Sequence, residues 1–373
     1  MPSIHIPPEI FLLICAEVEE PPTLAALCRT SPIFRDEAQR VLYRTIDLEG
    51  RDIRSFWSWA HAVTQNPHLA GRVHALSLQL PEDRKLAPAD VTKIQRALHA
   101  CVNLKELKLS CNEANGSESL HGWMLDGAPF RLTKFANTYF SSVYLEKSFW
   151  NTQSEIRALS LPRMHPSMTP AMFDAGRLPN LIAFGALPWQ ALPPGRPLQR
   201  LETSFSRDVP PLAQYSRTLT TLNLVRESLD NDVTLFRTIT NIVGLLPALL
   251  HFGIAELVRR AGVRLVERSP ATLLQGFSRL ETFFLFFRNE IRFFRPHSNL
   301  IYEMDYDKDV EDLAVSIMES ASPTLRRVVV GSEAQVDEVG REFTCTVTRD
   351  GDGEIHKSHA KKIDFDAVSM FWK

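Results

Sequence analysis

A six-residue phrase recurs along most of this chain and constrains its fold more than any other feature. The phrase has apolar residues at its first, fourth and sixth positions, as in LKELKL from Leu104 to Leu109. In an extended conformation these side chains enter one core, and the residues between them face the other way. Clear copies start at Val73, Leu104, Ile156, Leu219, Leu249, Leu280 and Leu325, and weaker copies start at Leu132, Leu181 and Leu198.

The spacing of the phrases indicates stacked repeats. Successive starts from residue 73 to residue 280 lie 31, 28, 24, 25, 17, 21, 30 and 31 residues apart. Their average of about 26 falls within the span typical of leucine-rich repeats. A single copy cannot bury its apolar face, so neighbouring copies must stack. Helical spacing over residues 88–101 and 230–246 predicts helices beside a parallel sheet. Asn112 follows one copy, at the position where such repeats bond their turning backbone. A generic α/β domain whose strands happen to repeat is the alternative.

The first 48 residues have a different pattern. Apolar residues at helical spacing follow Pro7 and Pro8 and predict an amphipathic helix: Ile10, Leu13, Ile14 and Val18. A second helical run covers residues 23–28. Ser31 and Pro32 then predict the N-cap and first turn of a third helix, which leads into a strand-like segment over residues 43–48. Three helices of this size enclose little core, so the unit needs a partner or a neighbouring domain.

This N-terminal pattern resembles the F-box family. The matching residues are Ile6-Pro7-Pro8-Glu9-Ile10, Ile14, Leu24, Leu27-Cys28-Arg29, Phe34-Arg35 and Ala38, and the resemblance covers residues 4–48. It departs from the family at residues 16–20, where relatives usually carry a leucine-bearing helix end. The resemblance implies docking on a Skp-type adaptor and, through it, on a cullin-RING ubiquitin ligase. The adaptor-binding residues it implies are Pro7, Pro8, Ile10, Ile14, Leu24 and Leu27. An ordinary cap would instead turn the first four of these inward.

The predicted fold class is α/β, with three parts. A short three-helix, F-box-like domain spans residues 1–48, and an irregular leucine-rich-repeat-like solenoid with a parallel sheet spans residues 49–340. A capping segment with a β-hairpin spans residues 341–373. Such a chain is expected to be the substrate-recognition subunit of an SCF-type (Skp, cullin, F-box) ubiquitin ligase, with no catalysis of its own. The alternative is a non-enzymatic repeat scaffold for protein-protein interaction with no ligase role.

The residues that face away from the predicted core are candidates for substrate binding. They lie at positions three, five and seven of each phrase, and in the early copies they are mostly small and neutral. Later copies supply charge, amide and aromatic groups, a mixture typical of binding hot spots. We therefore predict that the substrate, a protein of unknown identity, contacts Arg200, Glu202, Asn223, His251, Phe284 and Phe286. The alternative is that residues 283–287 form a strand buried on both faces beneath residues 288–308.

Sequence motifs that would mark an active site or a metal site are weak in this chain. The sequence lacks the usual hydrolase, NTPase and dinucleotide motifs, although an active site assembled from distant positions stays open. The acidic stretch at residues 350–354 lacks EF-hand spacing, since Ile355 and Lys361 occupy the glycine and glutamate positions. A hairpin turn is the better interpretation. Cys345, His356 and His359 lack the paired cysteines of a zinc site and favour a solvated strand. We expect no metal and no cofactor.

Charge and composition exclude further classes of partner. The formal net charge is −2, so the chain has no basic field to hold nucleic acid or an anionic membrane surface. The acidic N-terminus is unlike a secretory signal, and the most apolar run, residues 242–258, is too short and too interrupted to span a bilayer. Five cysteines without a CxxC pair predict reduced thiols, and therefore a cytoplasmic or nuclear protein.

Overall fold

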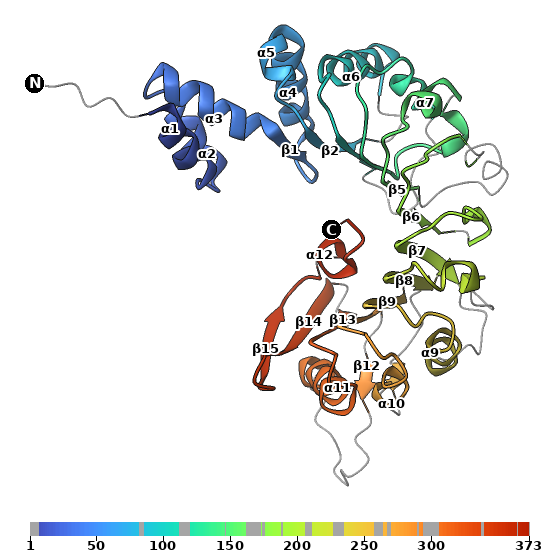
Figure 1. Cartoon of the computed structure of the whole chain (residues 1–373). Coiled ribbons are helices and arrows are strands. Elements are labelled where there is room, and N and C mark those ends of the chain that lie inside the picture. Colours follow the sequence, from blue (N-terminus) through green and yellow to red (C-terminus); the bar gives the residue numbers. More distant parts are fainter. Residues whose placement is uncertain are drawn as a thin grey trace, which may run out of the picture. The chain divides into compact units, whose positions relative to one another are not determined.

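The computed structural model of the chain forms two compact units, Met1–Asn180 and Leu181–Lys373 (Figure 1). The boundaries predicted at residues 48 and 340 are not tested by this division and stay predictions. The structure describes residues 7–81, 86–111, 120–145, 147–161, 173, 176–187, 189–205, 211–226, 235–256, 264–266, 270–288, 291–293, 306–336, 339–363 and 365–372.

The first unit begins with three helices, α1 (Pro8–Ala16), α2 (Pro21–Leu27) and α3 (Pro32–Arg44). Each helix starts on a proline, whose fixed φ and missing N–H suit the first helical turn. Ser31 caps α3 as predicted, since its Oγ accepts a 3.2 Å hydrogen bond from the backbone N–H of Phe34. The small core of these helices contains Cys15, Leu24 and Ala38.

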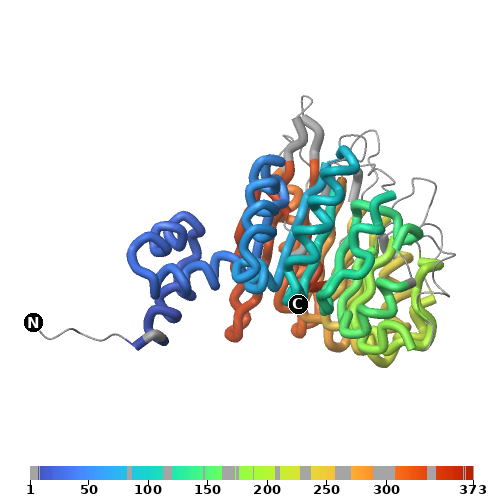
Figure 2. Tube along the Cα trace, turned by 90° about the horizontal axis from the view of Figure 1, so that it is seen from above, coloured from blue at the N-terminus to red at the C-terminus, as the bar shows by residue number. Residues whose placement is uncertain are grey.

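Five parallel strands follow in the first unit, in chain order: β1 (Thr45–Leu48), β2 (Ala75–Leu80), β3 (Glu106–Cys111), β4 (Lys134–Asn137) and β5 (Ala158–Ser160). Helices α4 (Ile53–Gln65), α5 (Pro67–Ala70), α6 (Pro88–Ala100) and α7 (Lys147–Thr152) lie on one side of these strands (Figure 1). Short 3-10 turns cover His121–Leu125 and Ser142–Tyr144. Helices α4 and α6 run side by side (Figure 2).

The second unit continues the pattern with six parallel strands: β6 (Ala183–Ala186), β7 (Arg200–Phe205), β8 (Thr221–Arg226), β9 (His251–Glu256), β11 (Thr282–Phe287) and β13 (Arg327–Val336). The short strands β10 (Arg264–Val266) and β12 (Ile291–Phe293) pair separately. Two 3-10 turns cover Trp189–Ala191 and Leu212–Tyr215. Helices α9 (Leu235–Val243), α10 (Ala271–Leu274) and α11 (Tyr306–Ser320) lie on one face (Figure 1).

The predicted C-terminal hairpin is present as β14 (Val339–Arg349) and β15 (Ile355–Ala360), which pair antiparallel after β13. Strand β15 ends at Ala360, and the chain then forms the short helix α12 (Phe365–Ser369). Helix α12 lies on the face of the sheet opposite to α9, α10 and α11 (Figure 1).

All ten phrases form strands, and each strand begins two residues after the start of its phrase. The residues at position four pair with one another from strand to strand. These rows are Leu76, Leu107, Phe135 and Leu159 in the first unit, and Phe184, Leu201, Leu222, Phe252, Phe283 and Val328 in the second. None of these side chains is more than 2% exposed. The predicted core positions are therefore confirmed, as are the α/β class and the mostly parallel strands.

A repeated backbone contact joins consecutive copies. The carbonyl oxygen at position two accepts hydrogen bonds from the N–H groups at positions two and three of the next copy. The Thr220 oxygen, for example, accepts from Leu250 at 2.8 Å and from His251 at 3.0 Å. The same pair of bonds recurs from β2 to β5 and from β6 to β13. These bonds join main-chain atoms, so they hold successive strands in one register whatever side chains the copies carry.

An asparagine bonds the turning backbone in one copy. Asn112, which was expected in this role, lies outside the described residues and stays a prediction. Asn137, at position six of the copy that starts at Leu132, is buried, and its Nδ2 donates to the Phe140 oxygen at 2.7 Å. Its Oδ1 accepts from the N–H groups of Tyr139 and Phe140. A buried amide in place of an apolar residue is stable here because its hydrogen bonds are satisfied.

The cysteines are all free thiols, and three of them are buried. Burial raises the pKa of Cys101 to about 12 and that of Cys345 to about 11. These thiols therefore stay protonated and pack as small apolar groups, as the sequence predicted. Among the helices in the described ranges, none is long and apolar enough to cross a membrane.

Burial of position four predicts a large cost for its truncation. Leu222 is fully buried in the row of the second unit. Leu222→Ala should lower the free energy of unfolding by about 2–5 kcal/mol, because the lost methyl groups leave a cavity. Gln214→Ala, at an exposed position nearby, should change it by less than about 0.5 kcal/mol. Denaturant unfolding measures both values, and equal stability of the two variants would contradict the proposed register.

Candidate functional site

The first candidate surface lies on the N-terminal helices. Ile10, Leu13 and Ile14 on α1 are 42%, 57% and 43% exposed, and Ile33 on α3 is 49% exposed. We call these four residues the N-terminal apolar surface. The spacing of the first three places them on one face of α1. The other face of α1 packs inward, with Cys15 fully buried and Phe11 against Phe34 at 4.7 Å between ring centroids. Helix α1 is therefore apolar on both sides, and the small core covers only one.

The residues implied for adaptor binding divide between surface and core. Pro7, Ile10 and Ile14 are exposed, and Leu27 is half-buried. Leu24 is only 4% exposed and belongs to the core with Cys15 and Ala38, so it cannot offer a surface contact. The Pro8 side chain lies outside the described part of the chain.

The implied set omitted Leu13 and Ile33, which are more exposed than Ile10. Leu13 could have been found from the sequence, because it belongs to the apolar stripe of α1. The sequence could not show which stripe of an all-apolar helix would face the core.

The second candidate surface lies on the strands of the second unit, on the side away from α9, α10 and α11. We call it the α12 face. It consists of phrase positions three, five and seven, which strand pairing aligns into rows. The rows are Arg200, Thr221, His251, Thr282 and Arg327; then Glu202, Asn223, Gly253, Phe284 and Val329; then Ser204, Val225, Ala255, Phe286 and Gly331. All six predicted substrate residues therefore lie on one face in adjacent rows.

The chain's own C-terminus covers this face. The Phe365 ring lies edge-on to Phe286 and Phe284, with centroid distances of 4.8 and 6.1 Å. Val368 is 7% exposed and packs in a cluster with Ala255, Phe284, Phe286 and Val329. The second unit therefore has an apolar cluster on each side of its sheet.

This cover corrects the prediction that the face offers exposed anchors. Asn223, Phe284 and Phe286 are only 3–4% exposed, whereas Arg200, Glu202 and His251 are half-buried. The alternative of a strand buried on both faces is right for β11, but the cover is α12. The proposed cover, residues 288–308, lies largely outside the described ranges. Phe284 and Phe286 point to the same side of β11 and form a large apolar area. Packing of α12 on this area is favourable because it removes apolar surface from water.

Polar side chains of the α12 face bind the tail through its main chain. The Asn223 Nδ2 donates to the Ser369 carbonyl oxygen at 2.9 Å. The Arg200 Nη1 donates to the Phe371 carbonyl oxygen at 3.2 Å. Phe371 itself is only 1% exposed. The face thus combines an apolar cluster with donors for peptide carbonyls.

Glycine at two positions of the face makes room for the aromatic rings. A Cβ on Gly253 would lie 2.2 Å from the Phe284 ring and 2.7 Å from the Asn223 Oδ1. A Cβ on Gly331 would lie 3.0 Å from the Phe286 ring. The ring of Phe284 therefore lies over the backbone of β9, a close approach that only glycine permits.

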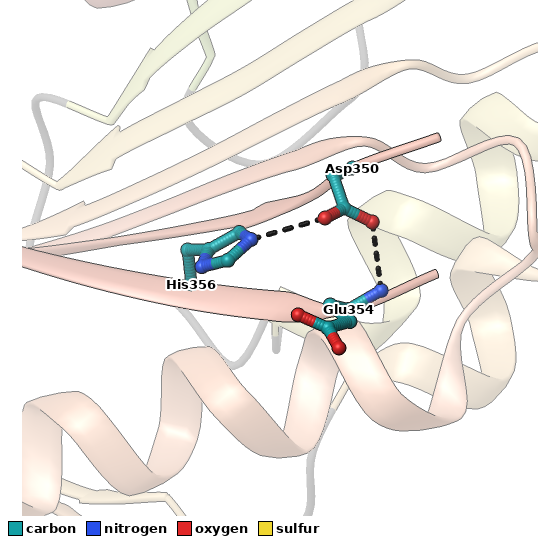
Figure 3. Close-up of side chains that lie close together, drawn as sticks. All are labelled: Asp350, Glu354 and His356. Atoms are coloured by element: carbon teal, nitrogen blue, oxygen red, sulfur yellow. Dashed lines mark hydrogen bonds and ion pairs between the residues drawn. The ribbon is translucent and has the colours of Figure 1, made fainter. Parts of the chain in front are cut away.

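The acidic turn of the hairpin brings Asp350, Glu354 and His356 together (Figure 3). The Asp350 Oδ1 accepts from the backbone N–H groups of Asp352 and Glu354 at 3.0 and 2.8 Å. Its Oδ2 lies 3.1 Å from the His356 Nε2. The hydrogen bond from His356 holds the pKa of Asp350 below its usual range. The Asp350 carboxylate thus closes the hairpin turn, which is the role the sequence favoured.

The other metal-binding alternative does not assemble. Residues three apart on a strand point to opposite faces, so His356 and His359 on β15 diverge. Cys345 is buried on β14, whereas the exposed His359 stacks on Phe343 and lies 3.1 Å from Glu311. These three side chains therefore do not form one ligand set.

Charged groups fix the hairpin to α11. Glu311 on α11 accepts from the Lys357 Nζ at 2.7 Å and contacts the His359 Nε2 at 3.1 Å. The hydrogen bond from Lys357 is the main reason that the pKa of Glu311 lies below its ordinary value of 4.5. Because β15 leads directly into the tail, this contact helps position the cover of the α12 face.

One buried ion pair was not predicted from the sequence. Arg226 and Glu256 end two neighbouring strands, β8 and β9, and their side chains are 5% and 9% exposed at 3.3 Å. No motif in the sequence indicates this pair, because each residue is simply the last one of an otherwise mainly apolar strand. Pairing compensates the desolvation of both charges, so the contact fixes the ends of β8 and β9 together.

No protein-family model matches this sequence, and no curated protein matches it. The function is therefore inferred from the motifs and from the geometry of the two surfaces.

The close approach at Gly253 predicts a specific steric effect. Gly253→Ala should lower the free energy of unfolding by about 1–3 kcal/mol, because the new methyl group overlaps the Phe284 ring. Gly244→Ala is the matched control, since no atom lies within 4 Å of its added Cβ. Phe284→Ala should cost less in the Gly253→Ala background than in the parent chain. Denaturant unfolding of the four variants measures this coupling, and additive effects would contradict the ring placement.

The lowered pKa of Glu311 predicts a pH-dependent contribution to stability. A carboxyl group whose pKa falls on folding stabilises the protein above its ordinary pKa and loses that contribution in acid. Glu311→Gln should therefore cost up to about 1 kcal/mol at neutral pH, the range for partly exposed ion pairs. The difference from the parent chain should shrink as the pH falls below 4.5. Glu281→Gln, at an exposed site that precedes β11, is the control for this measurement.

Proposed function

We propose that this chain is the substrate-recognition subunit of an SCF-type ubiquitin ligase and that its first three helices bind a Skp-type adaptor. The observation that carries the proposal is the exposure of Ile10, Leu13 and Ile14 on a helix whose other face already fills the core. A helix that is apolar all round is normally buried on all sides. The motif shared with the F-box family supplies the identity of the partner.

The energetics favour a protein partner for this surface. Full burial of an aliphatic side chain of this size contributes about 1.5–3 kcal/mol. Three such side chains on one face of α1 therefore provide a central apolar anchor of the kind that dominates protein interfaces. The acidic end of α1, with Glu17, Glu19 and Glu20 after it, departs from the family pattern and is expected to weaken this contact.

The rest of the chain is proposed to be a leucine-rich-repeat-like solenoid that holds the substrate. This is supported by the order of the strands, which follows the chain, and by the backbone bonds that recur from copy to copy. In this proposal the chain catalyses nothing, and other subunits transfer ubiquitin. It acts in the cytoplasm or nucleus, where free thiols stay reduced. The α12 face is the proposed substrate side.

Adaptor recovery tests the proposal. An Ile10→Ala, Ile14→Ala double variant should lose about 2 kcal/mol or more of binding free energy, which is roughly a thirtyfold loss of affinity. The matched control is a Val102→Ala, Val143→Ala variant, because these side chains are 51% and 48% exposed elsewhere in the first unit. Affinity for a purified Skp-type adaptor measures the effect, and melting curves check that both variants fold.

Two outcomes would overturn parts of the proposal. If the parent chain does not bind the adaptor, the ligase role falls, and the repeat scaffold becomes the better interpretation. If the double variant binds as well as the control, the N-terminal apolar surface is not the contact.

A further inference from the structure

The tail carries three apolar residues at regular spacing, Phe365, Val368 and Phe371, each three residues after the previous one. The side chains of Phe365 and Val368 pack on the α12 face, and the carbonyl oxygen of the buried Phe371 accepts from Arg200. Val368 and Phe371 are 7% and 1% exposed, and Phe365, which is 37% exposed, contacts Phe284 and Phe286 from the rim. The segment is short, and α12 itself has five residues. A helix of that length is not stable in water by itself, so the face must hold it in shape.

The hydrogen bonds between face and tail would accept other sequences. Asn223 and Arg200 both donate to main-chain carbonyl oxygens, those of Ser369 and Phe371. Every peptide offers such oxygens, so this contact fixes the position of a segment without reading its side chains. The apolar cluster of Ala255, Phe284, Phe286 and Val329 then selects the side chains. Hydrogen bonds to the main chain of the peptide combined with apolar pockets for its side chains are a recurring means of peptide recognition.

The tail is also placed so that it can leave. The connection from β15 to this segment runs through the exposed residues Lys361 and Lys362. Met370 adopts a φ of +54°, a left-handed conformation that is unfavourable for a residue with a Cβ. Dissociation of the segment relieves this conformation and leaves β7 to β13 paired.

From these observations we propose that the α12 face is a peptide-binding site that the tail occupies in cis. The external ligand is a protein segment with aromatic or aliphatic side chains at the spacing of Phe365, Val368 and Phe371, and it displaces the tail. The tail therefore competes with the substrate and limits binding to segments that match it well. This inference deepens the substrate half of the proposed function, and its test does not involve the adaptor.

The test compares the full chain before and after the tail is released. A site-specific protease sequence is inserted after Lys362, the chain is cleaved, and the released segment is removed by gel filtration. The probe is a fluorescent peptide of residues 363–373, followed by anisotropy. A tethered tail has an effective concentration on the order of millimolar, so the uncut chain should bind the probe at least tenfold more weakly than the cut chain.

Two control peptides keep the result specific. In the first, the three apolar residues are replaced by alanine, and in the second the residues of the tail are scrambled. Neither should bind the cut chain. A second measurement selects ligands for the cut chain from a random peptide display library, and the enriched sequences should carry apolar residues at positions i, i+3 and i+6.

Each failure has a definite meaning. If the cut chain loses its cooperative melting transition, the tail is part of the core and the proposal is wrong. If cut and uncut chains bind the probe equally, or if both control peptides bind, the face does not recognise the tail as a ligand. If the selected peptides lack the spacing, the assigned class of partner is wrong. Adaptor binding by the same preparation can succeed or fail independently.

Discussion

The structure depends on the burial of the side chains at positions one, four and six of each phrase against the neighbouring strands. No phrase can satisfy this requirement alone, so each strand must lie beside the next in the register that aligns position four with position four. The shared carbonyl at position two imposes the same register through the backbone. The core formed by positions one, four and six uses only one side of each strand. It therefore does not constrain the residues on the other side. The candidate binding residues are found there.

On the α12 face, this freedom has produced a second apolar cluster. It depends on Gly253, since any larger residue would occupy the space of the Phe284 ring. With the ring in place, Phe284 and Phe286 form an area large enough that exposure to water would be costly. The tail removes that cost, and its main chain accepts hydrogen bonds from Asn223 and Arg200. A cover of this kind both stabilises the second unit and occupies the surface best suited to a partner.

The N-terminal helices present the opposite situation, an apolar surface that the described part of the chain leaves exposed. Their core, around Cys15, Leu24 and Ala38, accepts only one side of α1. The three-helix unit is too small to bury both. In the proposed function, the N-terminal apolar surface binds the adaptor, and the α12 face binds the substrate in competition with the tail.

The sequence by itself determined the strands, the core rows, the Ser31 cap, the hairpin turn and the common face of Arg200, Glu202, Asn223, His251, Phe284 and Phe286. These follow from local rules, because the alternation of side chains along a strand and the requirements of caps and turns act within a few residues. Only the tertiary structure decided that Leu24 is buried while Leu13 is exposed, that Arg226 pairs with Glu256, and that residues 365–372 cover the α12 face. Each of these depends on which distant segment packs against an apolar or charged group in the folded unit. Packing of this kind involves the whole unit and leaves no periodic signal in the sequence.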